Sequence, residues 1–332
     1  MSSTTAAGAP TSKRFADAQQ KLLAFASLIA LVAVFGILRP DSFLQSSNFV
    51  AILQQTTVNG VLAIAATLVI ITGGIDLSIG TLMSFCAVIA GVILTWGQMP
   101  LAMGVIGTIL AGAAVGIFSG TLVAKLKIPP FIATLGMMLV LKGAALLISG
   151  TKPIYFNSTP GYSKISLGSL VGDVVPGLPL PNGVLVLFAV AIVTSFILGR
   201  TILGRFTFAL GSNEEAVRLS GVNVDAWKIA IYALAGGICG IAGILLSSRL
   251  NSAQPALGQG YELDAIAAVV IGGTSLSGGR GTILGTLIGA LITSVLSNGL
   301  RIMSVPQEWQ FVATGSIIIL AVFFDMLRQR RQ

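Results

Sequence analysis

The sequence predicts an all-α membrane protein, a polytopic bundle of about ten transmembrane helices with both termini on the cytoplasmic side. Two observations predict this class. Hydrophobic residues make up 55% of the 332 residues and charged residues only 9%, whereas a soluble domain carries about 25% charged residues. The apolar residues also fall in runs close to the ~20 residues that one membrane-spanning helix needs. The polar segments between them are shorter than the ~40 residues below which a lone domain rarely folds.

Ten apolar runs are expected to cross the membrane. The eighth run is short for a full span, so a shorter or partly re-entrant helix with its ends surrounded by protein is the alternative there. A signal peptide is disfavoured for the first run, because no small-residue cleavage site follows it. The ten runs are residues 22–38, 50–72, 77–95, 101–124, 131–149, 183–198, 229–247, 263–274, 281–298 and 310–327.

The segments outside these runs divide unequally in charge. Residues 1–21 are rich in Ser, Thr and Ala and are expected to form a disordered tail. Most Lys and Arg residues lie on the same side as this tail, including those of the loop 199–228 and the basic tail 328–332. This asymmetry obeys the positive-inside rule and places these segments in the cytoplasm. The proline-rich loop 150–182 is then an irregular outer loop, and residues 22–327 form the transmembrane domain.

The cytoplasmic loop contains the longest stretch that mixes charges of both signs. Ser212 and Glu215 have the spacing of a capping box, in which each side chain satisfies a backbone donor at a helix start. Glu214 and Arg218 lie four residues apart on one helix face. Gly221 supplies a helix stop. The spacing predicts a self-capped helix of about two turns in water.

Several kinds of chemistry lack the residues they need. The chain has no histidine, and Cys86 and Cys239 lie in separate apolar runs, which indicates neither a disulfide framework nor a metal site. The sequence LSGGR at 276–280 resembles the signature of ABC ATPases, but no GxxxxGK[ST] loop is present to hold phosphates. It is interpreted as a tight turn. Without these residues, no catalytic site is expected. The basic residues are scattered between the apolar runs, so nucleic-acid binding is not expected either.

Glycine patterns predict two structural features. The turns LVIITGGIDLSIG at 68–80 and AVVIGGTSLSGGR at 268–280 are similar, which indicates an internal repeat unless Gly-rich apolar sequences match by chance. Small-x-x-x-small spacings predict closely packed helices. These spacings involve Gly112, Gly116 and Gly120, and Gly236 and Gly240.

Polar residues in or beside the runs are candidates for a pathway. Asp76, Glu262 and Asp264 stand at the starts of predicted spans, the last two on the outer side, and are interpreted as helix caps. Lys142 lies within a span and is expected to snorkel outward or pack against a neighbour. Uncharged amides and hydroxyls suit a neutral, hydroxyl-rich solute, although hydrogen bonding between helices explains each of them equally well. The candidate pathway residues are Gln54, Gln55, Asn59, Thr134, Asn251, Gln254 and Asn298.

Four motifs together resemble the permease subunits of bacterial ABC sugar importers, most closely the ribose permease family. The likeness extends over about residues 43–325. It implies a multi-pass protein of the bacterial inner membrane that moves ribose or another pentose or hexose from periplasm to cytoplasm by alternating access. The motifs are GSNEEAVRLSG at 211–221, RLNSAQP at 249–255, YELDAIAAVVIGGTSLSGGRG at 261–281 and TGGIDLSIG at 72–80.

The resemblance also implies partners. These are a cytoplasmic ABC ATPase that carries ATP and Mg²⁺, a periplasmic sugar-binding protein, and a second copy of the chain or a related permease. No cofactor is expected on this chain. Residues 212–220 would form the coupling helix that sits in a cleft of the ATPase. The ATPase-coupling candidates are Gly211, Ser212, Asn213, Glu214, Glu215, Ala216, Arg218, Leu219, Ser220 and Gly221.

Two other function classes make different demands on the sequence. An ATP-independent secondary transporter or channel for a small neutral solute predicts ion-coupling carboxylates at mid-span, where none is expected here. A lipid-modifying intramembrane enzyme is disfavoured by the absence of histidine and of an Asp-rich metal cluster. The sequence therefore predicts a transport subunit rather than an enzyme.

Overall fold

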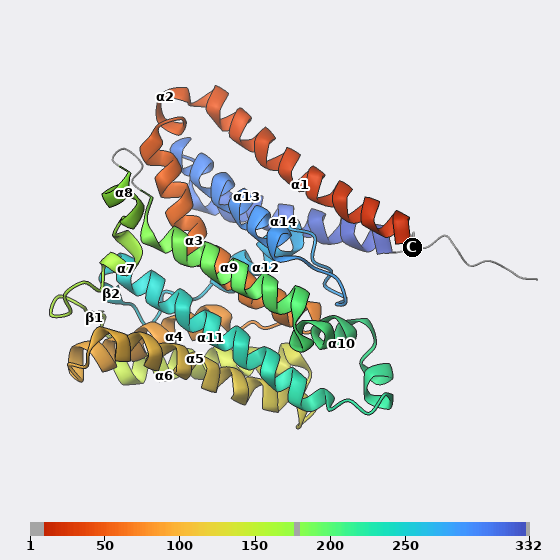
Figure 1. Cartoon of the computed structure of the whole chain (residues 1–332). Coiled ribbons are helices and arrows are strands. Elements are labelled where there is room, and N and C mark those ends of the chain that lie inside the picture. Colours follow the sequence, from red (N-terminus) through yellow and green to blue (C-terminus); the bar gives the residue numbers. More distant parts are fainter. Residues whose placement is uncertain (1–9, 176–179, 330–332) are drawn as a thin grey trace, which may run out of the picture.

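A computed structural model describes residues 10–175 and 180–329 of the chain. The bundle is elongated, and its long helices run between two ends (Figure 1). Helices α7 and α8 and the two short strands lie at one end, called here the α8 end. Helix α10 and the two described chain termini lie at the other end, called here the α10 end.

The regular secondary structure of the described residues is almost entirely helical, with one pair of two-residue strands. The strands pair antiparallel, with Ile154 opposite Ala253. A π-helical turn, Val92–Trp96, extends α4. The elements are α1 (Pro10–Leu38), α2 (Pro40–Phe43), α3 (Ser46–Ile71), α4 (Ile79–Gly91), α5 (Leu101–Ala124), α6 (Pro130–Ser149), β1 (Ile154–Tyr155), α7 (Lys164–Leu167), α8 (Leu170–Val174), α9 (Asn182–Arg200), α10 (Ile202–Leu219), α11 (Val224–Leu250), β2 (Ser252–Ala253), α12 (Tyr261–Ile271), α13 (Ile283–Ile302) and α14 (Gln307–Gln329).

Seven helices of the described chain are long and apolar enough to cross a membrane. They are α3, α4 with its π-helical turn, α5, α6, α9, α11 and α13. The prediction of an all-α membrane bundle is confirmed, but the count of ten spanning helices is not. The described apolar part of α1 is only Ala24–Leu38, and α12 has 11 residues.

Two expectations about the ends and the outer loop need correction. Helix α1 is described from Pro10 onward, so residues 10–21 of the expected disordered tail are helical; Ala, Gln, Lys and Leu favour helix in this stretch. Residues 1–9 and 330–332 lie outside the described structure.

The loop 150–182 holds β1, α7 and α8 rather than only irregular structure. It is anchored to α11, because the Tyr162 hydroxyl and Ser247 Oγ are 2.6 Å apart.

Helices α5 and α11 touch through their backbones, as the glycine spacings predict. A Cβ atom on Gly116 would lie closer than 3.0 Å to the Tyr232 carbonyl oxygen, and one on Gly112 would meet the Gly236 carbonyl oxygen in the same way. Side chains do not fit between the two helices at these points. We therefore treat α5 and α11 as one rigid pair.

Helix α12 crosses only part of the bundle. Its 11 residues measure about 16 Å at 1.5 Å per residue, roughly half of the ~30 Å hydrocarbon core. Residues 254–260 complete the crossing without helix. Gly258 is buried in this stretch, where it touches Gly80, whereas Ala256, Leu257 and Gln259 are exposed. The helix then runs antiparallel to α13, with Ala268 against Gly289 and Gly272 against Gly285. Of the two alternatives for this run, the structure has the shorter helix, within a segment that crosses the bundle.

The two similar Gly-rich turns have the same backbone geometry. Helices α3 and α12 both lead into a glycine with positive φ, Gly73 at +80° and Gly273 at +89°. In both, the N–H of this glycine donates to the carbonyl three residues earlier at 2.9 Å. The next N–H donates to the carbonyl five residues earlier, at 3.2 Å and 3.1 Å. This hydrogen bonding is common where a helix ends at a glycine with positive φ, so the internal repeat stays a prediction.

Candidate functional site

Helix α10 contains a joint at Asn213. This residue has extended backbone angles, φ −163° and ψ 96°, and separates residues 202–212 from a short helical segment. Its Oδ1 accepts a hydrogen bond from the Ala216 N–H at 2.9 Å. The predicted capping box is therefore wrong by one residue. Ser212 belongs to the preceding helix, where its Oγ donates to the Phe208 carbonyl at 2.9 Å, and asparagine is an equally good cap.

The segment beyond the joint, residues 214–220, is called here the distal segment. It has two different faces. Glu214 and Val217 are half-buried against the bundle, whereas Glu215 and Leu219 are exposed, with Leu219 82% exposed. The segment ends before Gly221, whose φ of +81° makes it the predicted helix stop. The outward face is thus free to meet another molecule.

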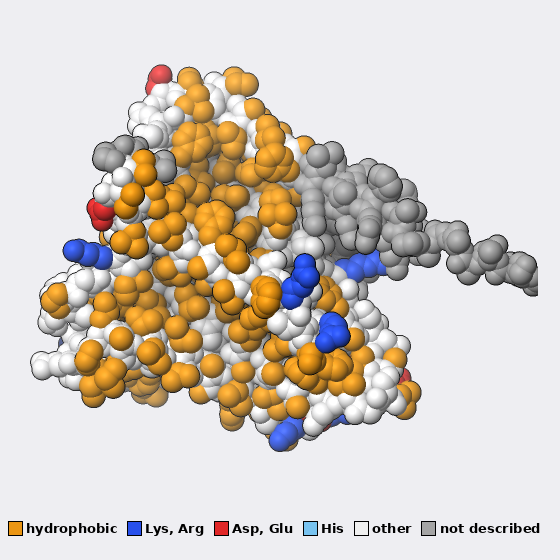
Figure 2. Space-filling model, viewed as in Figure 1, with side chains coloured by type: hydrophobic (Ala, Val, Ile, Leu, Met, Phe, Trp, Pro, Cys, Tyr) orange, Lys and Arg blue, Asp and Glu red, His pale blue; other side chains and the backbone are white. Residues whose placement is uncertain are grey.

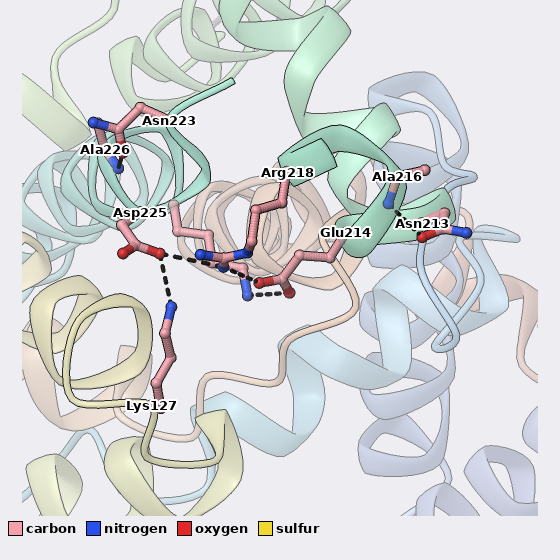
Figure 3. A network of polar contacts seen from close by, with 9 residues as sticks. Lys127, Asn213, Glu214, Ala216, Arg218, Asn223, Asp225 and Ala226 are labelled. Atoms are coloured by element: carbon pink, nitrogen blue, oxygen red, sulfur yellow. Dashed lines mark hydrogen bonds and ion pairs between the residues drawn. The ribbon is translucent and has the colours of Figure 1, made fainter. Parts of the chain in front are cut away.

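A chain of ion pairs holds the inward face (Figure 3). Glu214 pairs with Arg218 at 3.1 Å, as the sequence predicts, and also with Lys228 at 2.5 Å. Arg218 also pairs with Asp225 at 3.5 Å, and Asp225 pairs with Lys127 at 2.8 Å. These five residues, called here the ion chain, connect the distal segment with the α5–α6 turn and the start of α11.

The ion chain is intact at neutral pH. Burial alone would raise the pKa of Glu214, but Lys228 and Arg218 outweigh it, so this pKa lies below the ordinary value of 4.5. A carboxyl with a depressed native pKa contributes stability that is fully present above its unfolded pKa. That contribution is lost only as the pH falls through the depressed value. Changes of pH near neutrality therefore leave Glu214 paired.

The other side of the joint is fixed by backbone contacts. A Cβ atom on Gly211 would collide with the Ile71 carbonyl oxygen and lie 2.5 Å from the Gly279 nitrogen. That nitrogen donates to the Ile71 carbonyl at 2.8 Å. Gly278 and Gly279 have φ of +83° and +73°, a region that favours glycine. The LSGGR sequence is thus a tight turn, as interpreted, and it seats α10 against the end of α3.

A cavity of about 200 Å³ lies behind the Glu214–Lys228 pair. The Tyr232 hydroxyl is buried there and has no hydrogen-bond partner in the described part of the chain. The lining residues are Thr72, Gly73, Gly74, Val123, Pro130, Glu214, Lys228 and Tyr232.

The predicted pathway residues do not converge on one site. Asn59 lies half-way along α3 and donates to Thr293 Oγ1 at 3.2 Å. Thr134 Oγ1 accepts from the Leu77 N–H at 3.1 Å and so holds the α3–α4 loop. The Asn298 Oδ1 is buried on α13 without a partner among the described residues.

The remaining pathway candidates lie toward the α8 end. Asn251 donates to Asn157 Oδ1 at 2.9 Å, and Gln254 donates to Ser252 Oγ at 3.2 Å. The half-buried Gln54 and Gln55 lie in the part of α3 nearer this end. The backbone carbonyl of Gln54 accepts a hydrogen bond from the Arg249 side chain at 3.0 Å. These contacts join loops and helices to one another.

Two of the three predicted caps bind backbone donors. Asp76 Oδ1 accepts from the Ser78 N–H at 2.8 Å, directly before α4. The Glu262 carboxylate accepts from the Gly260 N–H, the N-cap of α12, at 3.0 and 3.1 Å. Asp264 is exposed and makes no such bond in the described structure. Capping therefore leaves its carboxylate unexplained.

Asp264 lies half-way between the two ends of the bundle, on its surface, rather than at the outer end. Ala268 faces Gly289 in the antiparallel pairing of α12 and α13. One helical turn further along, the same pairing places Asp264 level with Thr293, half-way along α13. The expected outer position of Glu262 and Asp264 is therefore wrong, because α12 starts inside the bundle. A charge facing lipid at this depth costs at least ~2.5–3.5 kcal/mol. The Asp264 carboxylate thus needs water or another protein surface in front of it.

A family model for the permease component of branched-chain amino acid transport systems matches residues 48–322. The chain belongs to this permease family. The ribose import permease protein of Escherichia coli K12 is 42% identical, over 94% of each chain. The fructose import permease protein of Rhizobium meliloti is 39% identical, over 90% of this chain and 83% of that protein. The xylose transport system permease protein of Haemophilus influenzae is 34% identical, over 92% and 96%.

No solved structure matches the permease. The predicted resemblance to transport permeases is confirmed, and with seven apolar helices the chain is a multi-pass membrane protein. Sequence reasoning missed three members of the ion chain, Lys127, Asp225 and Lys228. Lys127 and Asp225 are 98 positions apart, so no local spacing rule reveals their contact.

Proposed function

We propose that the permease is the membrane subunit of an ATP-binding cassette importer. It moves a sugar, ribose or another pentose or hexose, into the cytoplasm by alternating access driven by a partner ATPase. The distal segment carries this proposal, because it is a capped helix that offers a free face in a chain without a phosphate-binding loop. The sugar class follows from relatives described as ribose, fructose and xylose permeases.

The orientation follows from charge. The positive-inside rule assigns the α10 end, with both described termini, to the cytoplasm of a bacterial cell. Figure 2 shows that hydrophobic side chains cover the surface between the α8 end and the α10 end, and that the visible charged side chains lie mostly toward these two ends. A periplasmic sugar-binding protein would dock at the α8 end of the inner-membrane bundle. ATP and Mg²⁺ would bind to the ATPase at the α10 end, and a second permease copy or a relative would complete the pore.

The free face of the distal segment gives the first prediction. We expect Leu219→Asp to lower ATP-dependent sugar uptake in proteoliposomes at least about tenfold, since a buried hot-spot anchor of an interface contributes ~2 kcal/mol or more. Leu219→Ala should have a smaller effect in the same direction. Leu126→Ala removes an equally apolar exposed side chain elsewhere at this end and is the matched control. Normal uptake and normal ATPase binding by Leu219→Asp would refute the coupling role.

The solute pathway is proposed to pass the N-terminal half of α12. The exposed carboxylate of Asp264 lies in this half. It suits sugar hydroxyls, since charge-assisted hydrogen bonds are about twice as strong as neutral ones. Gln54, Gln55, Asn59, Thr134, Asn251, Gln254 and Asn298 stay as further candidates, their hydrogen bonds being explained equally well by structure.

Asp264 gives the second prediction. We expect Asp264→Asn to lower the maximal uptake rate about tenfold, the effect of losing ~1.4 kcal/mol. The sugar affinity of the binding protein should not change. Asp173→Asn, at an exposed carboxylate of α8, is the control. Uptake at the normal rate by both Asp264→Asn and Asp264→Leu would remove Asp264 from the pathway.

The alternative is an ATP-independent secondary transporter or channel for a small neutral solute. The observation that favours it is Asp264 itself, because carboxylates at mid-depth serve as ion-coupling groups in such proteins. Under this alternative, Asp264→Asn abolishes gradient-driven flux through the chain alone.

A further inference from the structure

The two parts of α10 are attached to the bundle in different ways. Before the joint, Gly211 rests on the backbone of Ile71 and Gly279, and the rings of Phe206 and Trp227 pack with centroids 4.8 Å apart. Beyond the joint, the distal segment is held by the ion chain and by the half-buried Val217. Backbone contacts of this kind cannot slide, whereas ion pairs can part and re-form.

The ion chain ends on a rigid body. Lys127 follows α5, and Asp225 and Lys228 belong to the start of α11. Since α5 and α11 are locked by their glycine contacts, a pull on either end moves both helices together. The side chains of Lys127 and Arg218 are 54% and 46% exposed, and exposed pairs of this kind are individually weak. The distal segment is therefore connected to the α5–α11 pair by several contacts that can part and re-form one at a time as the segment moves.

The cavity behind the Glu214–Lys228 pair provides room for movement. It lies between the turn after α3 and the side chain of Tyr232 on α11. The unpartnered Tyr232 hydroxyl offers a hydrogen-bond partner to a side chain that moves inward. Glu214 can thus change partners without any shift of the fixed part of α10.

We propose that Lys127, Asp225 and Lys228 are positioning residues for energy coupling. Together with Glu214 and Arg218 they form a latch that fixes the angle of the distal segment about Asn213. The latch passes the movement of that segment to the α5–α11 pair. This inference rests on the proposed coupling function of the distal segment. The competing explanation is a surface ion network that contributes to stability alone.

The test uses the permease assembled with its ATPase and binding protein in proteoliposomes, and measures sugar imported per ATP hydrolysed. We expect Lys127→Ala and Asp225→Asn to lower this ratio about fivefold, the effect of losing ~1 kcal/mol, with ATP hydrolysis retained. The double variant should fall no further than the worse single one, because both remove the same contact. Lys127→Arg should keep the ratio. Lys125→Ala removes an exposed cation two positions away and is the matched control.

An unchanged ratio in Lys127→Ala and Asp225→Asn, or an equal fall in Lys125→Ala, would overturn the latch. Amide hydrogen exchange of residues 214–220 in the complex gives a second readout without transport. Exchange should be faster in Lys127→Ala than in Lys125→Ala, and equal rates would contradict the proposal. If the unaltered complex shows no ATP-driven uptake, the proposed function fails, while the exchange rates still decide whether the latch exists.

Discussion

Replacing Gly116 by alanine is expected to prevent folded permease from accumulating in the membrane. A single Cβ atom at this position would collide with the carbonyl group of Tyr232, and a backbone carbonyl within a helix cannot move aside. Helices α5 and α11 would have to separate along their whole contact. Overpacking of this kind belongs to the class of substitutions that cost more than ~4–5 kcal/mol, a large part of a typical stability of about 5–15 kcal/mol.

Membrane protein level and thermal unfolding in detergent measure this effect. Gly143→Ala is the matched control, because a Cβ atom on that glycine of α6 meets nothing within 4 Å. The control should accumulate normally. A Gly116→Ala protein as abundant and as heat-stable as the control would show that α5 and α11 are not locked together.

Replacing Gly211 by alanine is expected to lower transport strongly while much of the protein still folds. The new methyl group would displace α10 from the Ile71 carbonyl and break its hydrogen bond with Gly279. The distal segment beyond Asn213 would then be displaced together with residues 202–212. We expect ATP-dependent uptake to fall on the order of a hundredfold, the loss that a misplacement of ~1 Å can cause in an organised site.

Gly199→Ala is the control for this substitution, since a Cβ atom on that glycine of α9 also meets nothing within 4 Å. Uptake assays at equal protein level compare the two variants. Equal uptake by Gly211→Ala and Gly199→Ala would mean that the seat of α10 on the α3 turn does not matter for coupling.

Local sequence was enough to predict the long helices. The predicted run 101–124 coincides with α5, because Pro100 and the Lys125–Lys127 stretch mark its two ends. The glycine spacings on α5 and α11 similarly predicted their close contact. In both cases the deciding property, apolar length or residue size, belongs to neighbouring positions on one helix.

Depth and long-range pairing could not be predicted in this way. Hydropathy finds the apolar residues of α12 but not that residues 254–260 enter the bundle without helix, so Asp264 was assigned to the wrong level. The cap of the distal segment was misplaced because Ser212 and Asn213 are both good caps. Only the preceding helix, which continues through Ser212, decides between them. The ion chain joins three separate segments, which only the fold brings together.

The most direct test of the proposed function is reconstitution of the purified permease in proteoliposomes, with and without its ATPase and binding protein. We predict that ribose or a related sugar accumulates only when both partners and ATP are present, and that the permease alone is silent under ion and solute gradients. Gradient-driven sugar flux through the permease alone, unaffected by the ATPase and ATP, would contradict the proposal that force enters through the distal segment of α10.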